Sequence, residues 1–351
     1  MEQRDIRFAV IGTGRISNWV LQGARQDKRF RLAAVCSRDE QRAAAFINAH
    51  PEWPEARVFT SVEELAGAPD IDAVYIGTPN ATHFAYAKTL LEGGKHVLCE
   101  KPLVTDASLA RELAETARRR KCLLMEAMIS TLNPNFTVAA AHIPAIGPIR
   151  SYFSSYCQYS TKYDDLRRGV VASSLDPQMG GGAVMDIGIY TLYPMIALFG
   201  APSSITTEAM LADTPHGPVD VGGSIQCRYA GMMANLVFSK AVDSFLPTEI
   251  AGENGNILLD AVHICREVWM LPHGTPSSGR GPKTEARILS SGIPHDEYYY
   301  EFHHFMDLIL DGCTESPVNR LDTSIAVLDV IDEFHCQINE RHAYWRFPDS
   351  T

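Results

Sequence analysis

The chain has 351 residues, of which 46% are hydrophobic and 21% are charged, and its formal net charge is −11. One hydrophobic core rarely organises a chain of this length, so we expect two domains. The acidic balance argues against nucleic acid as a partner, because binding to phosphate backbones needs clustered Lys and Arg.

The first third of the chain alternates short apolar runs with longer amphipathic stretches. We expect strands at 7–11, 31–36, 73–77, 96–100 and 123–128, and helices at 15–26, 39–50, 81–92 and 106–121. Strands that are apolar throughout and alternate with helices indicate a parallel, doubly wound sheet. Asp106 is an expected N-cap, and Gly93-Gly94 is an expected helix end.

The pattern changes after residue 128. We expect helices at 133–142, 183–199, 298–310 and 322–339, strands at 149–158, 224–229 and 232–239, a hairpin turn at Asn254-Gly255, a polar loop at 160–178 and a surface loop at 273–283. Consecutive strands with period-2 polarity and turn residues between them indicate a mainly antiparallel sheet. We therefore predict an α/β fold with one domain at 1–130 and a second at 131–351.

The cellular compartment is suggested by the cysteines and by the lack of targeting segments. The eight cysteines are widely spaced and form no C-x-x-C pair, which indicates reduced thiols. No apolar region of signal type precedes the first strand, and no uninterrupted apolar run approaches the roughly 18 residues of a membrane span. We expect a cytoplasmic protein without a membrane segment.

The first strand runs into Gly12-Thr13-Gly14-Arg15-Ile16-Ser17, a G-x-G-x-x-S turn that opens a helix. One glycine permits the tight turn, the second lets backbone amides approach a pyrophosphate, and the helix N-terminus supplies positive potential. A chance glycine turn is the alternative, but the position inside a β-α-β unit favours dinucleotide binding.

The residues after the second strand bear on the choice between NAD and NADP. An NAD enzyme usually has an acidic residue there for the ribose hydroxyls, whereas this chain has Ser37 and Arg38. Arg38 can pair with a 2′-phosphate, and Ser37 can add a hydrogen bond. Alternatively, Arg38 only precedes the next helix, with Asp39 weakening its field. We favour NADP, with NAD as the other option.

Two further clusters are candidates for catalysis. Lys101 follows the strand at 96–100, and ligands of doubly wound sheets bind at the carboxyl ends of strands. Pro102 restricts Lys101 to an extended conformation, and the bond between them can be cis. A surface lysine paired with Glu100 is the alternative.

Asp186 and Tyr190 lie at i and i+4 of the helix expected after Gly180-Gly181-Gly182 and so share a face. Their spacing alone fits a functional pair and an ordinary helix start equally well.

Together these motifs resemble the glucose-fructose oxidoreductase, inositol dehydrogenase and MocA (Gfo/Idh/MocA) family over nearly the whole chain. The similarity rests on the glycine turn, Gly77-Thr78-Pro79-Asn80-Ala81-Thr82-His83, Glu100-Lys101-Pro102 and the segment from Gly180 to Tyr190. It implies a Rossmann domain and a second domain whose open sheet often forms a dimer interface, hence a homodimer or a dimer of dimers. It also implies that Thr78, Pro79, Asn80 and His83 line the cofactor, with Glu100 and Lys101 beside the nicotinamide.

Many members have His where Tyr190 stands, so this chain resembles the branch with dimeric dihydrodiol dehydrogenase and NADP-dependent xylose dehydrogenase. We therefore expect hydride transfer between nicotinamide and a hydroxyl or carbonyl group of a sugar, polyol or cyclic diol. Lys101 would polarise the reacting oxygen and lower the pKa of Tyr190, and Asp186 would orient the substrate. A non-catalytic dinucleotide-dependent regulator and an NAD-dependent glycosidase are the alternatives.

Two expectations are less specific. Tyr163 and Arg167, in the loop before the catalytic helix, are candidate substrate contacts, although charged loop residues are commonly only solvated. We expect no metal, because neither HExxH nor clustered Cys and His spacing occurs, and the adjacent His303 and His304 face different ways on a helix.

Overall fold

A computed structural model describes residues 4–273 and 286–341, so most of the surface loop expected at 273–283 lies outside the described residues. The chain forms two compact units. Unit 1 comprises Met1–Ile129 and His295–Ile325, and unit 2 comprises Ser130–Pro294 and Ala326–Thr351. The sequence pattern assigns everything after residue 130 to one domain, whereas in the structure His295–Ile325 pack with unit 1.

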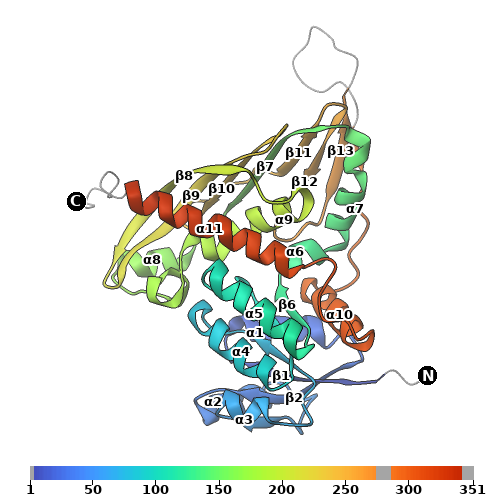
Figure 1. Cartoon of the computed structure of the whole chain (residues 1–351), viewed down its shortest axis with the longest axis vertical. Helices are drawn as coiled ribbons and strands as arrows, with labels where there is room; N and C mark the ends of the chain where they lie inside the picture. Colours follow the sequence, from blue (N-terminus) through green and yellow to red (C-terminus); the bar gives the residue numbers. More distant parts are fainter. Residues whose placement is uncertain (1–3, 274–285, 342–351) are drawn as a thin grey trace. The chain divides into compact units, whose positions relative to one another are not determined.

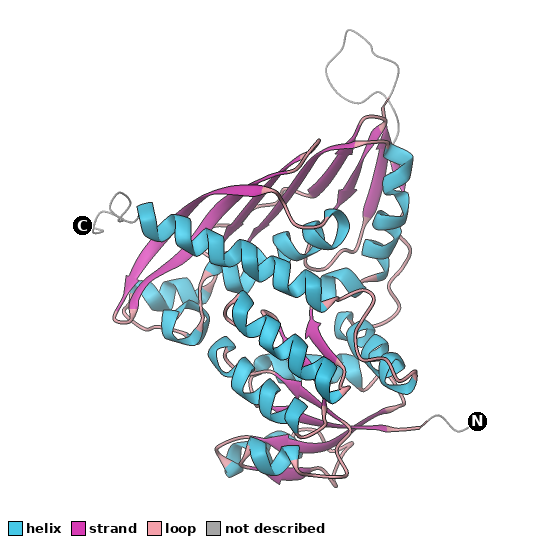
Figure 2. Ribbon diagram, in the orientation of Figure 1, coloured by secondary structure: helices cyan, strands magenta, loops and turns pink. Residues whose placement is uncertain are grey.

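Unit 1 contains a six-stranded sheet in the order β3-β2-β1-β4-β5-β6, in which every neighbouring pair is parallel (Figures 1 and 2). Its strands are β1 (Ile6–Ile11), β2 (Phe30–Cys36), β3 (Arg57–Phe59), β4 (Ala73–Ile76), β5 (His96–Glu100) and β6 (Leu124–Ala127). This is the Rossmann strand order, and it reverses between β1 and β4. The doubly wound parallel sheet is therefore confirmed.

Short polar side chains cap three of the helices around this sheet. The helices are α1 (Arg15–Ala24), α2 (Glu40–Asn48), α3 (Val62–Ala66), η1 (Asn80–Thr82), α4 (His83–Glu92) and α5 (Ala107–Arg120). The side chains of Asp39, Ser61 and Asp106 each accept a hydrogen bond from a backbone N–H of the first turn. Asp106 caps α5 as expected, and α4 ends at Gly93.

Helix α10 (Glu297–Leu310) joins unit 1 because it completes an aromatic core. The ring of Phe302 lies 5.4 Å from that of Phe8 and 5.5 Å from that of Phe30, between ring centroids. Gly23 of α1 lies so close to α10 that a Cβ there would be 2.6 Å from the backbone of Tyr298. Amphipathic periodicity predicts the helix but not which core it covers, which explains the difference from the expected division.

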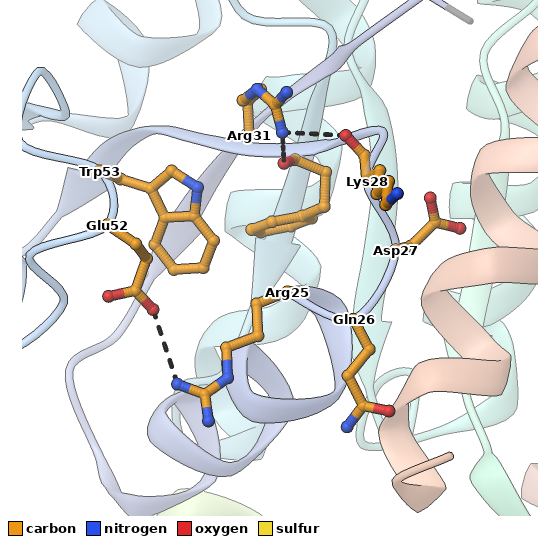
Figure 3. Close-up of a pocket in the computed structure, with 8 residues that line it drawn as sticks. Arg25, Gln26, Asp27, Lys28, Arg31, Glu52 and Trp53 are labelled. Carbon is orange, nitrogen blue, oxygen red and sulfur yellow. Dashed lines mark hydrogen bonds and ion pairs between the residues drawn. The ribbon is translucent and has the colours of Figure 1, made fainter. Parts of the chain in front are cut away.

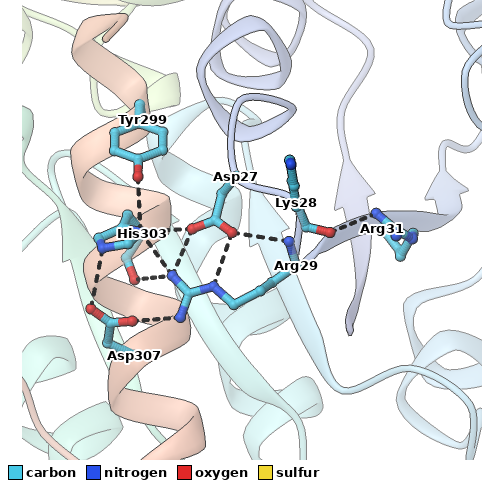
Figure 4. Close-up of polar contacts among 7 residues, drawn as sticks. All are labelled: Asp27, Lys28, Arg29, Arg31, Tyr299, His303 and Asp307. Carbon is cyan, nitrogen blue, oxygen red and sulfur yellow. Dashed lines mark hydrogen bonds and ion pairs between the residues drawn. The ribbon is translucent and has the colours of Figure 1, made fainter. Parts of the chain in front are cut away.

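A partly buried polar network also fixes α10 (Figure 4). Arg29 Nε donates to Asp27 Oδ1 at 2.9 Å, and Arg29 Nη1 donates to Asp307 Oδ1 at 2.5 Å. His303 Nδ1 lies 2.7 Å from Asp27 Oδ2. Burial alone would raise the pKa of Asp27, but the hydrogen bonds from Arg29 and its charge lower that pKa to about 2.

Unit 2 contains an eight-stranded sheet in the order β14-β13-β12-β11-β7-β10-β9-β8. Its strands are β7 (Ile149–Cys157), β8 (Ser204–Thr214), β9 (Gly217–Arg228), β10 (Met233–Ser239), β11 (Thr248–Gly252), β12 (Gly255–Leu259), β13 (Val268–Pro272) and β14 (Arg287–Ile288). Among the described strands of this sheet, only β7 and β10 pair in parallel, so the mainly antiparallel sheet is confirmed. A hairpin joins β11 to β12 as expected. Its two-residue loop is Glu253-Asn254, whereas the sequence predicts the turn at Asn254-Gly255.

Helices lie against one side of this sheet (Figure 2). They are α7 (Pro134–His142), α9 (Ile189–Phe199) and most of α11 (Leu321–Arg341), while the short α6 (Ile129–Leu132) and η2 (Ile143–Ile146) flank α7. Phe334 of α11 packs edge-on against Phe238 of β10, with ring centroids 5.8 Å apart. On β7, Tyr152 and Ser154 are buried, whereas Phe153 and Ser155, which alternate with them, point to the other side and stay partly exposed.

The segment expected to be a polar loop at 160–178 is instead a folded lobe. It contains α8 (Thr161–Arg167), η3 (Ser173–Leu175) and η4 (Pro177–Met179). Leu166 and Leu175 are buried against Val219 and Val221 of β9. The apolar residues of this segment are too widely spaced to show a helical period. Most of its residues are polar, so the sequence pattern predicts a loop there.

One described helical segment, Pro177–Phe199, is long and apolar enough to cross a membrane, with a mean hydropathy of 1.5. Of its most apolar window, 72% is buried inside the structure. This is the burial expected for the core helix of a folded domain, whose apolar residues are covered by protein.

Candidate active site

The glycine turn after β1 has the geometry of a dinucleotide cradle. Gly12 has φ +99°, and a Cβ there would lie 2.5 Å from the carbonyl oxygen of Gly77. Gly14 is the N-cap of α1, and among the described residues no atom comes within 4 Å of where its Cβ would be. Both glycines lie where the strand order reverses, with open space at the helix N-terminus, so this turn fits a bound pyrophosphate.

Ser17 occupies the third position of the fingerprint and keeps α1 close to β4. It is fully buried, and a Cβ on Gly77 would lie 2.8 Å from its Oγ. A larger side chain at either residue would push the helix from the strand end. The small residue therefore serves the packing role that the fingerprint usually gives to Gly or Ala. Thr13 and Ile16 are half-buried, and Arg15 is exposed with its guanidinium 4.9 Å from the Trp19 ring centroid.

The turn after β2 presents an exposed Arg38 beside the half-buried Ser37. Asp39 faces away into its own helix, where its Oδ1 accepts from the Arg42 N–H at 3.1 Å and its Oδ2 lies 3.5 Å from Arg42 Nε. Asp39 is thus occupied as an N-cap and ion-pair partner.

The turn after β4 is held by two kinds of contact. Thr78 Oγ1 and Thr82 Oγ1 are 2.7 Å apart, and Pro79 and Asn80 open the η1 turn. His83 is fully buried, with Nε2 2.8 Å from the Thr78 carbonyl oxygen and Nδ1 2.9 Å from the Pro102 carbonyl oxygen. His83 therefore joins the turn after β4 to the turn after β5, and offers no surface of its own to a ligand.

Lys101 follows β5 directly, and its bond to Pro102 is cis. It is half-buried. Glu100 is only 8% exposed, and its carboxylate accepts from Tyr75 Oη at 2.6 Å and from the Lys101 N–H at 3.2 Å. Glu100 thus fixes the backbone of the turn after β5 through its hydrogen bonds to Tyr75 and to the Lys101 N–H.

Two more buried carboxyl groups lie in unit 1. Burial raises the pKa of Glu301 on α10 well above its ordinary value, and the charge of Glu100 raises it further. Burial raises the pKa of Glu126 on β6 to about 7, although its Oε1 accepts from the Leu103 N–H at 3.0 Å.

In unit 2, two of the three glycines before the candidate helix are required by close contacts. A Cβ on Gly181 would lie 2.6 Å from the Asp176 backbone nitrogen, and a Cβ on Gly182, with φ +139°, would lie 2.2 Å from Asp220 Oδ1. The carboxylate of Asp220 accepts from the Val184 N–H at 2.7 Å and so caps the helix start. Burial raises the pKa of Asp220 to about 7.

The segment with Asp186 is a π-helical turn, Val184–Gly188, that continues into α9, rather than the uniform α-helix expected at 183–199. Such turns are frequent at functional sites. Asp186 forms an ion pair with the buried Lys240, which follows β10. Gly188 lies against the ring of Phe238, which would be 3.0 Å from a Cβ placed on this glycine.

Tyr190 belongs to an aromatic group. Its ring packs edge-on against Tyr156 of β7 at 5.7 Å and against His263 at 6.3 Å, between centroids. Tyr156 and His263 stack face to face at 4.1 Å. Burial, with the charge of Arg266, lowers the pKa of His263 to about 4, so this imidazole is neutral at physiological pH.

The two loop residues expected to contact substrate have local roles in α8. Tyr163 packs against the small core of Leu166 and Val219. Arg167 is exposed and interacts with Tyr159, whose hydroxyl donates to Asp164 at 2.7 Å. Neither contact tests a substrate role, which stays a prediction.

The structure describes no group of three or more His, Cys, Asp or Glu side chains that could hold a metal ion. One described pocket, of about 740 Å³, is lined by Arg25, Lys28, Phe30 and Trp53 among others (Figure 3). It lies where α1 leads into β2, at the amino ends of the strands. Dinucleotides bind at the carboxyl ends, so this pocket is separate from the cofactor site.

Sequence reasoning missed Asp220, Lys240, Tyr156 and His263. Each stands alone in the sequence, and three of them lie in or directly after strands that are far from residue 186 in the chain. A lysine at the end of the apolar strand β10 is the one available signal, because lysine is rarely buried without a partner.

Comparison with known proteins identifies the family. A family model described as an oxidoreductase family with an NAD-binding Rossmann fold matches residues 6–128, and one for the GFO/IDH/MocA C-terminal domain matches residues 144–258. The chain belongs to the Gfo/Idh/MocA oxidoreductase family. The predicted resemblance and the prediction of an NAD(P)-dependent oxidoreductase are thereby confirmed.

Similar members of the Gfo/Idh/MocA family span nearly the whole chain. The NADP⁺-dependent scyllo-inositol 2-dehydrogenase IolU of Bacillus subtilis is 35% identical over 95% of this chain and 97% of its own. Trans-1,2-dihydrobenzene-1,2-diol dehydrogenase of Xenopus laevis is 30% identical over 93% of this chain and 96% of its own. The solved structure of KijD10, a 3-ketoreductase of Actinomadura kijaniata in complex with NADP and TDP-benzene, matches with a TM-score of 0.78 and 26% identity, covering 95% of this chain and 98% of its own.

Proposed function

We propose that this chain is an NADP-dependent dehydrogenase or reductase that interconverts a secondary alcohol and a ketone on a cyclic polyol, a sugar or a cyclic diol. The observation that carries the proposal is the set of functional groups at the switch point of the sheet. Gly12 and Gly14 form a cradle after β1, and Lys101 follows β5 two strands away. The substrate class is supported by the inositol and dihydrodiol dehydrogenases to which the chain is similar.

The residues at the carboxyl ends of the strands fit the dinucleotide. The turn of Gly12, Thr13 and Gly14 would hold the pyrophosphate at the N-terminus of α1, with Arg15 and Ile16 in the first turn. Ser37 and Arg38 would bind the 2′-phosphate. Thr78, Pro79 and Asn80 would line the nicotinamide half, and His83 would hold their turn in place. When bound, the nicotinamide accepts or supplies a hydride.

Lys101, Asp186 and Tyr190 are the proposed catalytic residues. During oxidation the substrate loses a hydride from carbon and a proton from its hydroxyl group. Lys101 donates a hydrogen bond to the reacting oxygen and favours the negative charge that develops on it. Tyr190 exchanges the proton, and the carboxylate of Asp186 accepts a hydrogen bond from a substrate hydroxyl group. Glu100 keeps Lys101 in place through its contact with the Lys101 N–H.

We further propose a cytoplasmic homodimer, or a dimer of dimers, that associates through the helix-free side of the unit 2 sheet. Phe153 on β7 and Val237 on β10 point to that side. All eight cysteines are free, and six are buried, as expected for a reducing compartment.

The decisive experiment is a screen of NADP(H)-linked absorbance at 340 nm against inositols, pentoses, hexoses and cyclic dihydrodiols. We expect turnover with at least one cyclic polyol or diol. Turnover of none of these compounds in either direction, by a folded protein that binds NADPH, would contradict the proposed activity and favour a regulatory role.

A further inference from the structure

Lys240 follows the last residue of β10 and is only 5% exposed. Its backbone is fixed on both sides, since its N–H donates to the Val221 carbonyl oxygen at 2.8 Å and its own carbonyl oxygen accepts from the Ser160 N–H at 2.9 Å. The side chain is therefore directed inward by a fixed backbone. Burying an ammonium group is costly unless anionic partners compensate for the lost water.

The carboxylate of Asp186 provides this compensation directly. Lys240 Nζ donates to Asp186 Oδ2 in a direct ion pair. Its charge also lowers the pKa of Asp220, opposing the larger effect of burial on that group. Asp220 in turn caps the turn that carries Asp186, through the Val184 N–H. Lys240 thus connects the start of the π-helical turn with its central carboxylate.

The exposures within this ion pair differ. The side chain of Lys240 is 6% exposed, whereas that of Asp186 is 30% exposed. One oxygen of Asp186, Oδ2, is engaged by the ammonium group. A carboxylate accepts up to four hydrogen bonds, so binding Lys240 leaves acceptor capacity for a substrate hydroxyl group.

We propose that Lys240 is a positioning residue that orients the Asp186 carboxylate for recognition of a substrate hydroxyl group. The inference rests on the proposed function, because it deepens the role of Asp186 in that activity. Lys240 does not touch the reacting atoms. It acts through Asp186, and it makes β10 part of the substrate-recognition machinery of unit 2.

The test compares Lys240→Met, Lys240→Arg and Asp186→Asn in the full-length protein, using NADP(H) and a polyol accepted by the unmutated enzyme. We expect Lys240→Met to lower kcat/KM about 10- to 100-fold, in the range seen when an outer partner of a functional ligand is removed. Lys240→Arg keeps the cation and should restore at least part of this loss. The Kd for NADPH should stay within twofold in all variants.

A double-variant cycle separates positioning from a structural role. If Lys240 acts through Asp186, the Lys240→Met/Asp186→Asn double variant loses little more activity than Asp186→Asn alone. Lys95→Met is the matched control, since Lys95 is 6% exposed and its Nζ donates to the carbonyl oxygens of Ala68 and Ile71 in unit 1. This control should lower Tm while kcat/KM stays within twofold.

A substrate series adds a readout that a purely structural residue would not change. Among single-deoxy analogues of the accepted polyol, the analogue without the hydroxyl group that Asp186 binds should be insensitive to Lys240→Met. The inference about Lys240 alone fails if the unmutated enzyme turns over a polyol while Lys240→Met stays within twofold, or if the losses in the double variant multiply. No turnover by the unmutated protein would overturn the proposed function, and the inference with it.

Discussion

The hydroxyl group of Tyr75 donates to Glu100 Oε1 at 2.6 Å, and the same carboxylate accepts from the N–H of Lys101. Tyr75 is fully buried, and its phenol lies directly under the turn that presents the lysine. Burial and the charge of Glu100 raise the pKa of Tyr75, so the phenol keeps its proton and remains a donor. A buried hydrogen bond to a charged acceptor thus connects the core of the sheet to the candidate catalytic turn.

Tyr75→Phe should destabilise the protein by about 1–3 kcal/mol, because it leaves the buried Glu100 carboxylate without one donor. Turnover should fall several-fold through displacement of Lys101. The measurements are urea unfolding and steady-state kinetics. Tyr300→Phe is the matched control, because among the described residues the buried Tyr300 hydroxyl has no hydrogen-bond partner. Equal effects of the two substitutions would show that the Glu100 contact is unimportant.

Arg38 should set the preference for NADP(H). It is exposed after β2, and Asp39 beside it is occupied by its own helix. Each charge-assisted hydrogen bond to a 2′-phosphate contributes about 1.5–3 kcal/mol, so Arg38→Ala should weaken NADPH binding by at least tenfold. NADH binding should change little. Fluorescence titration checks this, with Arg31→Ala, at the amino end of β2, as control. Equal Kd values for both cofactors in the unmutated protein would contradict the assignment.

Glu126 should make stability depend on pH. Burial raises its pKa to about 7 in the folded protein, whereas an unfolded glutamate has a pKa of about 4.3. Between these values the unfolded state releases the proton first, so the free energy of unfolding falls as pH rises from about 4.5 to about 7. Glu126→Gln removes this contribution to the pH dependence of the free energy of unfolding. The amide oxygen of Gln remains an acceptor for the Leu103 N–H.

The variant should therefore gain stability relative to the unmutated protein as pH rises across that window, by roughly 3 kcal/mol at most. Urea unfolding at pH 5.0 and pH 7.5 measures the difference. Glu115→Gln on the exposed side of α5 serves as control and should leave the pH dependence unchanged. A difference between Glu126→Gln and the unmutated protein that does not vary with pH would show that this carboxyl group is not perturbed.

The sequence was sufficient to predict the parallel sheet, because its main strands are buried on both faces and therefore apolar throughout. It missed β3, since Arg57–Phe59 has three residues, none of them fully buried. It also missed the lobe around α8, whose core consists of a few residues brought together by β9. Short elements that depend on distant partners leave no periodic signal.

The candidate site shows the same limit. Glycine turns and strand-end residues are local features, so Gly12, Lys101 and Asp186 could be selected from the sequence. The ion pair between Asp186 and Lys240 joins residues 54 positions apart in the chain. It depends on the register of β10, which the sequence does not reveal.

The helix-free side of the unit 2 sheet should mediate dimer formation. Sedimentation velocity at micromolar concentration should give a dimer or a tetramer of this chain. Val237→Arg places a charge on that side, where Val237 lies opposite Ser155 of β7, and should shift the protein to a smaller species with an unchanged fold. Val242→Arg, in the loop after β10, is the matched control. A monomeric unmutated protein would refute the proposal.

The last prediction concerns catalysis by Lys101 and Tyr190. General acid–base groups typically contribute about 10²–10⁴-fold, so Lys101→Met or Tyr190→Phe should lower kcat by that factor. Lys101→Met removes the donor to the reacting oxygen, and Tyr190→Phe removes the hydroxyl group while keeping the ring that packs on Tyr156 and His263. NADPH affinity and Tm should change little in Tyr190→Phe, which separates lost chemistry from lost folding.

The matched control for Tyr190→Phe is His263→Phe. His263 has a pKa of about 4 and is neutral above pH 5, so it cannot account for a proton transfer between pH 5 and pH 9. Its replacement by another aromatic ring should preserve the shape of the pH–rate profile, whereas Tyr190→Phe should abolish an ionisation in that profile. If both Lys101→Met and Tyr190→Phe retained turnover within a few-fold of the unmutated enzyme, the catalytic assignment would be wrong.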